Sequence, residues 1–311
     1  MMYNAQPNLS PEQLAVVKSY RRIEDLIPSH WLEGDIQANG IRHHYYRTGG
    51  EKPPLVLLHG FQESALCWLR VAKVLEREYD LILVDARGHG RSDRIGSGFS
   101  PELLTEDAAG VIRALEMDRP TVLGFSMGGD TAIRLAATHP QLVRSVLVGG
   151  SSDKQPDGQA MLNSEGYQAW YKSWLTWLEN LETQTHEERL LSTLAQLPPG
   201  SPLPSEDEYV PMVDANAHVD LDLARLGNNL WSQAGDQVAE TKAMLRRITC
   251  PVLLMYSGFF PVPGAPQTLR EEPSEQTNVK IVRFENAGHL IYRDRFEQFI
   301  DVVKTFLKEH E

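Results

Sequence analysis

The first residues whose types and spacing could do chemistry are 124–128, which read GFSMG and fit the pattern G-x-S-x-G. Context strengthens this short match. Residues 121–123, which read TVL, predict a strand directly before it, and GDTAIRL, starting at Gly129, predicts a helix directly after it. A tight turn between strand and helix needs glycine on both sides of the serine, and it presents the hydroxyl above the sheet edge. Ser126 is therefore the candidate nucleophile.

Two backbone amides are candidates to stabilise the oxyanion that forms when a serine attacks a carbonyl. Residues 59–61 read HGF and follow an earlier predicted strand, so the amide of Phe61 can turn towards Ser126. The amide of Met127 lies at the start of the next helix, where the helix dipole adds positive potential. We expect Phe61 and Met127 to form an oxyanion hole, with His59 bracing the loop.

A histidine stands where a general base would be needed. Residues 286–289 read NAGH, between the last predicted strand (278–285) and the terminal helix (293–307). A loop at the carboxyl edge of the sheet lets the ring reach the serine hydroxyl. Among the ten histidines, only His289 has this position, so it is the candidate base.

The elements that must position these residues follow an alternating pattern. Near-continuous Val, Leu and Ile runs alternate with amphipathic helical stretches, which is typical of a parallel sheet covered on both faces. The fold class is therefore α/β. The runs are PPLVLLHG (53–60), YDLILVDA (79–86), PTVLGFS (120–126), RSVLVGG (144–150), PVLLMYS (251–257) and NVKIVRFE (278–285).

The segments outside this alternation give three parts. Residues 10–28 predict one helix, with Ser10 as N-cap and Gln13 closing a capping box. Asn39-Gly40 joins two alternating stretches into a predicted hairpin. Residues 151–242 contain no convincing strand, and their tryptophans at 170, 174 and 177 share one helix face, which favours packing inside that module. The expected domains are a helical extension (1–28), a core (29–150 and 243–311) and a helical cap (151–242).

Four motifs together resemble the α/β-hydrolase superfamily: HGFQES, DARGHGRSD, GFSMGG and the late AGHL. The resemblance runs from about residue 40 to the C-terminus. It implies an eight-stranded, mostly parallel sheet, a helical cap after the sixth strand and the order nucleophile, acid, histidine. It also implies catalysis without a cofactor. In this resemblance Asp85, Arg87 and His89 are structural residues that brace the oxyanion side.

The acid of the triad is missing from its expected place. The family pattern puts an aspartate after the next-to-last strand, where this chain has Phe260, with Phe259 beside it. Some members place the acid after the sixth strand, where Gly149 and Gly150 stand. Asp153 follows three residues later and is our preferred candidate. The alternatives are a cap aspartate, another carboxylate, or a dyad with no acid; the cap aspartates are Asp214, Asp220 and Asp222.

The side chains expected near Ser126 are apolar and predict a hydrophobic pocket formed by Phe61, Phe125, Met127, Phe259 and Phe260. We therefore expect a serine hydrolase that cleaves a small hydrophobic carboxylic ester through an acyl-enzyme. Two alternatives stay open. One is a C–C hydrolase or lyase on the same fold, and the other is a small-molecule binding protein whose catalysis has relaxed.

Composition excludes several other classes of function. A net charge of −12 disfavours nucleic acid and anionic membrane surfaces as partners, since both would repel the chain. No apolar run approaches the length of a membrane span, and residues 1–13 show no secretory signal. Cys67 and Cys250 have no disulfide or metal-site spacing, which suits a reducing cytoplasm. The expected partner is a small hydrophobic substrate, and the expected state is a monomer or homodimer.

Overall fold

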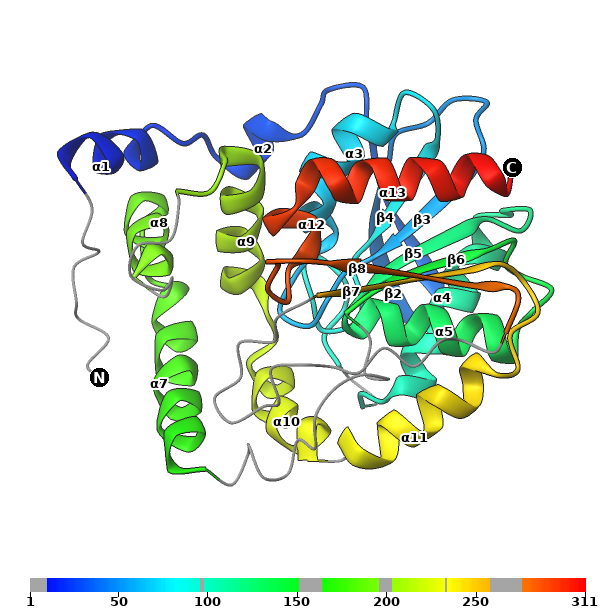
Figure 1. Ribbon diagram of the computed structural model, residues 1–311. Helices are drawn as coiled ribbons and strands as arrows, with labels where there is room; N and C mark the ends of the chain where they lie inside the picture. Colours follow the sequence, from blue (N-terminus) through cyan, green and yellow to red (C-terminus); the bar gives the residue numbers. More distant parts are fainter. Residues whose placement is uncertain (1–9, 96–97, 151–163, 196–202, 233, 258–275) are drawn as a thin grey trace.

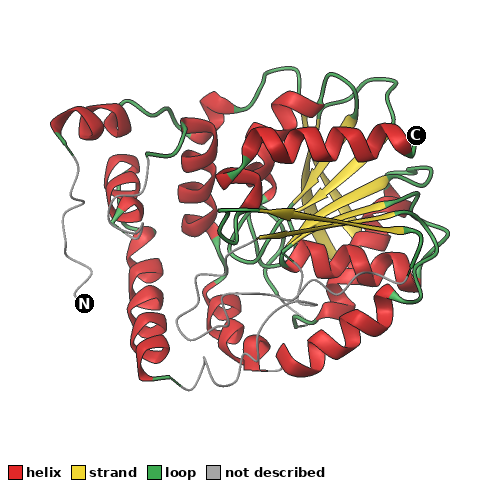
Figure 2. Cartoon of the chain, viewed as in Figure 1, coloured by secondary structure: helices red, strands yellow, loops and turns green. Residues whose placement is uncertain are grey.

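The computed structural model describes residues 10–95, 98–150, 164–195, 203–232, 234–257 and 276–311. Within these ranges the chain forms one eight-stranded sheet with helices on both faces (Figures 1 and 2). The strand order is β1-β2-β4-β3-β5-β6-β7-β8. The strands are β1 (Leu32–Ala38), β2 (Ile41–Arg47), β3 (Pro54–Leu58), β4 (Asp80–Val84), β5 (Thr121–Phe125), β6 (Val146–Gly149), β7 (Val252–Ser257) and β8 (Val279–Phe284).

Strand directions match the expectation from the alternating pattern. Strand β2 is antiparallel to both of its neighbours, and β3 to β8 pair in parallel. The predicted hairpin is confirmed: Ala38 pairs with Ile41, and Asn39 and Gly40 both have positive φ, as a two-residue hairpin turn requires. The parallel strands place the loops that follow β3, β5, β6 and β8 at one edge of the sheet.

Strands β3 to β7 are buried on both faces, because successive side chains point to opposite sides and helices cover each side. In β3, Leu55 and Leu57 join one apolar cluster, and Val56 and Leu58 join the other. Helices α3 (Leu69–Leu75), α12 (Ile291–Asp294) and α13 (Phe296–Glu309) cover the first face, while α4 (Pro101–Ala114), α5 (Met127–Thr138) and α11 (Ala234–Leu245) cover the second (Figure 1). None of the helices in the described ranges combines the length and the apolar character that a bilayer crossing needs.

The described parts of the stretch between β6 and β7 are helical, as predicted. Its described elements are α7 (Glu165–Leu181), α8 (His186–Leu194), α9 (Glu206–His218), α10 (Leu221–Ser232) and α11. Trp174, Trp177 and Leu181 of α7 are buried in a small apolar cluster of their own, whereas Trp170 is 47% exposed. The tryptophan face therefore serves mainly to pack the inserted helices together.

The prediction of one helix over residues 10–28 is wrong. Helix α1 spans only Pro11–Lys18, and a second short helix, α2, spans Ile23–Leu26. The predicted capping box is confirmed, since Ser10 Oγ accepts from the Gln13 amide and Gln13 Oε1 accepts from the Ser10 amide. Residues between the helices instead contact the inserted helices: the Tyr20 hydroxyl donates to the Pro204 carbonyl, and the Arg21 guanidinium pairs with Glu206. These tertiary contacts stabilise the break between α1 and α2 more than one continuous helix would be stabilised by its apolar periodicity.

Candidate active site

Ser126 lies in the turn between β5 and α5, with φ +50° and ψ −115°. A positive φ is costly for a residue that carries a Cβ, so the turn holds local strain of the kind found at functional sites. The Ser126 amide donates to the Gly149 carbonyl at 2.6 Å, which ties the turn to β6. A methyl group on Gly124 would overlap the carbonyl of Gly128, and one on Gly128 would overlap the carbonyl of Leu58. Both glycines are therefore required by the backbone.

The amides of Phe61 and Met127 are available to an oxyanion. Within the described residues, neither N–H donates to a protein acceptor. Met127 opens α5, and the first amides of a helix have no partner inside it. The two turns that carry these amides are also held together, because the Gly128 amide donates to the His59 carbonyl at 3.1 Å. This arrangement fits an oxyanion hole with one donor from each turn.

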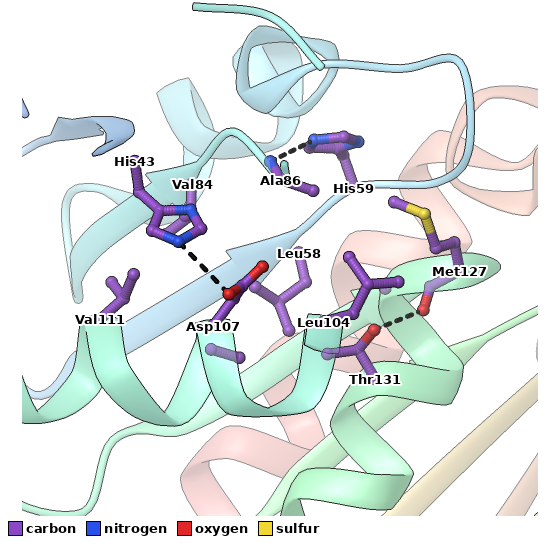
Figure 3. A pocket seen from close by; sticks show the side chains of 12 residues that line it. His43, Leu58, His59, Val84, Ala86, Leu104, Asp107, Val111, Met127 and Thr131 are labelled. Atoms are coloured by element: carbon purple, nitrogen blue, oxygen red, sulfur yellow. Dashed lines mark hydrogen bonds and ion pairs between the residues drawn. The ribbon is translucent and has the colours of Figure 1, made fainter. Parts of the chain in front are cut away.

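His59 and His89 brace the oxyanion side as neutral rings. His59 Nδ1 donates to the Gly60 carbonyl at 2.7 Å, and its Nε2 accepts from the Ala86 amide at 3.0 Å (Figure 3). His89 Nε2 accepts from the Gln62 amide at 3.3 Å, next to Phe61. Burial lowers the pKa of His59 to about 3 and that of His89 to about 4. Their hydrogen bonds place both in the role expected of them, which is to hold the loop.

A buried ion pair anchors the loop that carries His89 to helix α4. Arg87 Nε and Nη2 donate to the two carboxylate oxygens of Asp107 at 2.5 and 2.6 Å. Burial alone would raise the pKa of Asp107, but the hydrogen bonds from Arg87 hold it below its usual value. Asp85 accepts from the amides of Ala65 and Arg91, so it also has a structural role.

Met127 is not among the residues that line the pocket of Ser126, contrary to expectation. It lines a separate cavity of about 30 Å³ behind the turn, together with Leu58, Leu104 and Thr131 (Figure 3). The Thr131 hydroxyl donates to the Met127 carbonyl at 2.9 Å and fixes this first turn of α5. Met127 therefore offers its amide to the site but adds no apolar wall to the pocket of Ser126.

His289 shares a pocket with Ser126. The loop that carries it follows β8 and includes Asn286 at φ +55°. Its ring lies 4.9 Å from the ring of Phe125, centroid to centroid, and a Cβ on Gly150 would lie 3.0 Å from its Cε1. Burial lowers the pKa of His289 to about 4, so the imidazole is neutral near pH 7 and able to accept the serine proton.

The pocket that holds both residues has a volume of about 350 Å³. Phe61 and Phe125 line it, as the sequence suggested. Sequence reasoning missed the rest of the lining: Gly60, Gln62, Glu63, Cys67, Glu208, Met212, Asn216, Leu290, Tyr292 and Arg293. Three of these, at positions 208, 212 and 216, recur every four residues on α9. That spacing marks one helix face, although the sequence does not tell which face meets the pocket.

Several predicted acid and pocket residues fall outside the described residues, namely Asp153, Phe259 and Phe260. The cap aspartates are described, and each has other partners. Asp220 accepts from the Ile95 and Asp222 amides, while the side chains of Asp214 and Asp222 pair with His218 and Arg225. None of the three lines the pocket of Ser126.

Glu63 is a buried carboxyl group that the sequence did not single out. Its Oε2 accepts from the Gly60 amide at 2.7 Å, and its Oε1 accepts from the Tyr292 hydroxyl. Burial raises the pKa of Glu63 against the opposing effect of these hydrogen bonds. In the described part of the chain, no group of three or more histidine, cysteine or acidic side chains is placed to hold a metal ion.

Comparison with known proteins decides the family. A family model for the alpha/beta hydrolase fold matches residues 53–296. The chain belongs to the α/β-hydrolase family. This result confirms the resemblance seen in the four sequence motifs, and the strand order and flanking helices agree with it.

Relatives of this α/β hydrolase differ in the reactions that their names describe. A pimeloyl-[acyl-carrier protein] methyl ester esterase from Aliivibrio fischeri strain MJ11 is 27% identical over 268 residues, which is 86% of this chain and 98% of the esterase. A fluoroacetate dehalogenase from a Burkholderia species is 34% identical over 120 residues, but this match spans only 38% of the dehalogenase. Among solved structures, an N-formylmaleamic acid deformylase from Pseudomonas putida S16 superimposes with a TM-score of 0.68 at 21% identity, over 88% of this chain and 100% of that one. The structural likeness concerns the fold alone.

Proposed function

We propose that this protein is a serine hydrolase that cleaves a small carboxylic ester through an acyl-enzyme. Ser126 attacks the carbonyl carbon, and His289 takes its proton and later returns a proton to the alcohol that leaves. The amides of Phe61 and Met127 hold the oxyanion. The single observation that carries the proposal is a strained serine in one pocket with a half-buried, neutral histidine, beside two amides that have no acceptor among the described residues.

A carbonyl substrate fits these groups better than an alkyl halide does. Negative charge develops on a carbonyl oxygen as the serine adds to it, and two preorganised amides stabilise that charge. Displacement of a halide from a saturated carbon forms no such oxyanion, so the two amides would have no role. The long match to a methyl ester esterase also supports a carboxylic ester, and not an alkyl halide, as the substrate. Phe61, Phe125 and Leu290 give the pocket an apolar surface for the carbon chain of the ester.

The proposed triad acid is Asp153. Gly150, the last described residue before it, lies against the His289 ring, and three residues of chain can span about 10 Å. An acid there would hold the imidazole tautomer and stabilise its charged form. We expect Asp153→Asn to lower kcat/KM by up to about 10⁴-fold. A silent Asp153→Asn would show that the acid is another residue or that the protein uses a dyad.

The decisive experiment combines turnover with labelling. Wild-type protein should release p-nitrophenol from p-nitrophenyl butyrate in a burst equal to the enzyme concentration, and a fluorophosphonate should label Ser126. Ser126→Ala should abolish both, with a loss in kcat of about 10⁶-fold, as for other serine nucleophiles. Ester hydrolysis that survives in Ser126→Ala would refute the proposal.

A further inference from the structure

Arg293 brings a positive charge to the pocket of Ser126. It lies in the short helix α12, four residues after His289, and lines the same pocket as Ser126. Its Nη1 donates to the Met212 sulfur at 3.4 Å, a weak acceptor. Among the described residues it forms no ion pair. A half-buried guanidinium that has only a thioether as partner keeps most of its donors available to a ligand.

The two carboxyl groups in the pocket lining are already engaged by other donors. Both oxygens of Glu63 accept hydrogen bonds, one from the Gly60 amide and one from the Tyr292 hydroxyl. Glu208 Oε1 accepts from Arg70 at 2.5 Å, and its Oε2 accepts from Ser205 at the start of α9. Neither carboxyl group is therefore placed to neutralise Arg293.

The electrostatic balance of the pocket favours an anion. Burial raises the pKa of Glu63, which disfavours its charged form, and Arg70 compensates the charge of Glu208. Burial also raises the pKa of Tyr292, and the charge of Arg293 opposes the rise in both groups. A fixed cation in a partly desolvated pocket is stabilised by a ligand that supplies a carboxylate in the planar geometry of the guanidinium.

We propose that the substrate is an ester that also carries a carboxylate, and that Arg293 binds this carboxylate while Ser126 attacks the ester carbonyl. The assignment rests on the proposed function and names its substrate class. The apolar surface of Phe61, Phe125 and Leu290 would hold the carbon chain between the two ends. Hydrolysis with water then gives an alcohol and an acid, one of which keeps the original carboxylate.

The experiment compares matched esters that differ in the carboxylate. Monomethyl esters of dicarboxylic acids from succinate to pimelate are paired with methyl alkanoates in which a methyl group replaces the carboxylate. Acyl glycolates paired with ethyl esters place the charge on the alcohol side. For at least one pair, wild type should prefer the anionic ester. Arg293→Met should lower kcat/KM for that ester by about 10- to 100-fold, mainly through KM, as expected for a lost charge-assisted contact.

Controls separate this contact from folding and from the chemistry. The neutral ester should change by less than about threefold in Arg293→Met, and Arg293→Lys should recover part of the preference because it keeps the charge. Arg77→Met removes an exposed guanidinium near the opposite edge of the sheet, before β4, and should change neither ester. Thermal unfolding of each variant verifies that it is folded.

The results distinguish failure of this inference from failure of the proposed function. If wild type hydrolyses no ester of either kind and no fluorophosphonate labels Ser126, the proposed function is wrong. If hydrolysis depends on Ser126 but wild type shows no anionic preference in any pair, the substrate class is wrong while the function stands. If a preference exists and Arg293→Met leaves it intact, the role given to Arg293 is wrong while the proposed function stands.

Discussion

Burial keeps His289 in its neutral form at the pH where most proteins work, and this has a kinetic consequence. The base is active when it is deprotonated, so activity is lost as pH falls through its pKa. Because burial lowers the pKa of His289 to about 4, the loss should occur well below the ordinary histidine pKa of about 6.5.

The corresponding prediction concerns the acid limb of the pH profile. With a neutral ester as substrate, kcat/KM should stay level from about pH 8 to pH 5 and fall with a midpoint near 4. Initial rates after a rapid change of pH avoid slow acid unfolding. A midpoint near 6.5 would show that His289 is not the essential base or that its pocket is more hydrated.

The sequence singled out Ser126 and His289 as candidate nucleophile and base because each stands in a short motif beside a predicted strand end. It did not identify Glu63 or Arg293. Glu63 becomes notable only when the Gly60 amide and the Tyr292 hydroxyl surround it, and Tyr292 lies 229 residues away. Arg293 belongs to the pocket because α12 turns back over the sheet edge after His289. Contacts of this kind join residues that are distant in the sequence, so they depend on the complete fold and leave no pattern in the local sequence.

At the scale of elements, the turn between β5 and α5 is fixed by backbone contacts with three other segments. The Ser126 amide binds the end of β6, the Gly128 amide binds the loop after β3, and Gly128 packs directly on the Leu58 carbonyl. A side chain at Gly128 must displace backbone atoms, which cannot move without disturbing β3.

We therefore expect Gly128→Ala to destabilise the protein by about 1–3 kcal/mol or more and to abolish most ester hydrolysis. Gly166→Ala is the matched control, because Gly166 lies in α7 with no atom within 4 Å of the new methyl group. It should leave activity unchanged and stabilise the protein by up to about 1 kcal/mol. Urea unfolding and kcat/KM measure both effects; an active, stable Gly128→Ala would contradict the account of this turn.

Most elements could be predicted because their patterns are local. The apolar runs predicted the parallel strands, and Asn39-Gly40 predicted the hairpin. The failure at residues 19–22 has a physical cause, since periodicity favours one helix while Tyr20 and Arg21 gain partners on the α8–α9 connection and on α9 by leaving it. The gain comes from residues almost 200 positions away, which no local rule includes.

At the scale of the whole molecule, buried histidines connect folding to pH. The folded chain keeps His89 neutral down to about pH 4, while the unfolded chain binds a proton near 6.5. Between these values the unfolded state holds the extra proton, so His89 lowers stability as pH falls. His59 and His289 act in the same direction. Glu63 and Asp85 act oppositely, because burial raises the pKa of each carboxyl group.

A difference measurement isolates one histidine from these opposing groups. His89→Gln keeps a donor and an acceptor but cannot be protonated. As pH falls from 6.5 to 4, the free energy of unfolding of His89→Gln should rise relative to that of wild type by about 1.4 kcal/mol for each pH unit. His30→Gln, at a largely exposed histidine, serves as the surface control. If the free energies of unfolding of wild type and His89→Gln change in parallel between pH 6.5 and pH 4, His89 is charged in the folded state, contrary to this prediction.

The contacts of Tyr20 and Arg21 connect the first part of the chain to the pocket of Ser126 through helix α9. They hold the start of α9, and the same helix presents Glu208, Met212 and Asn216 to the pocket. Substitutions at Tyr20 or Arg21 would shift α9 without touching Ser126 or His289. A substitution in this peripheral segment would therefore alter the lining of the pocket of Ser126 while it leaves the proposed catalytic groups unchanged.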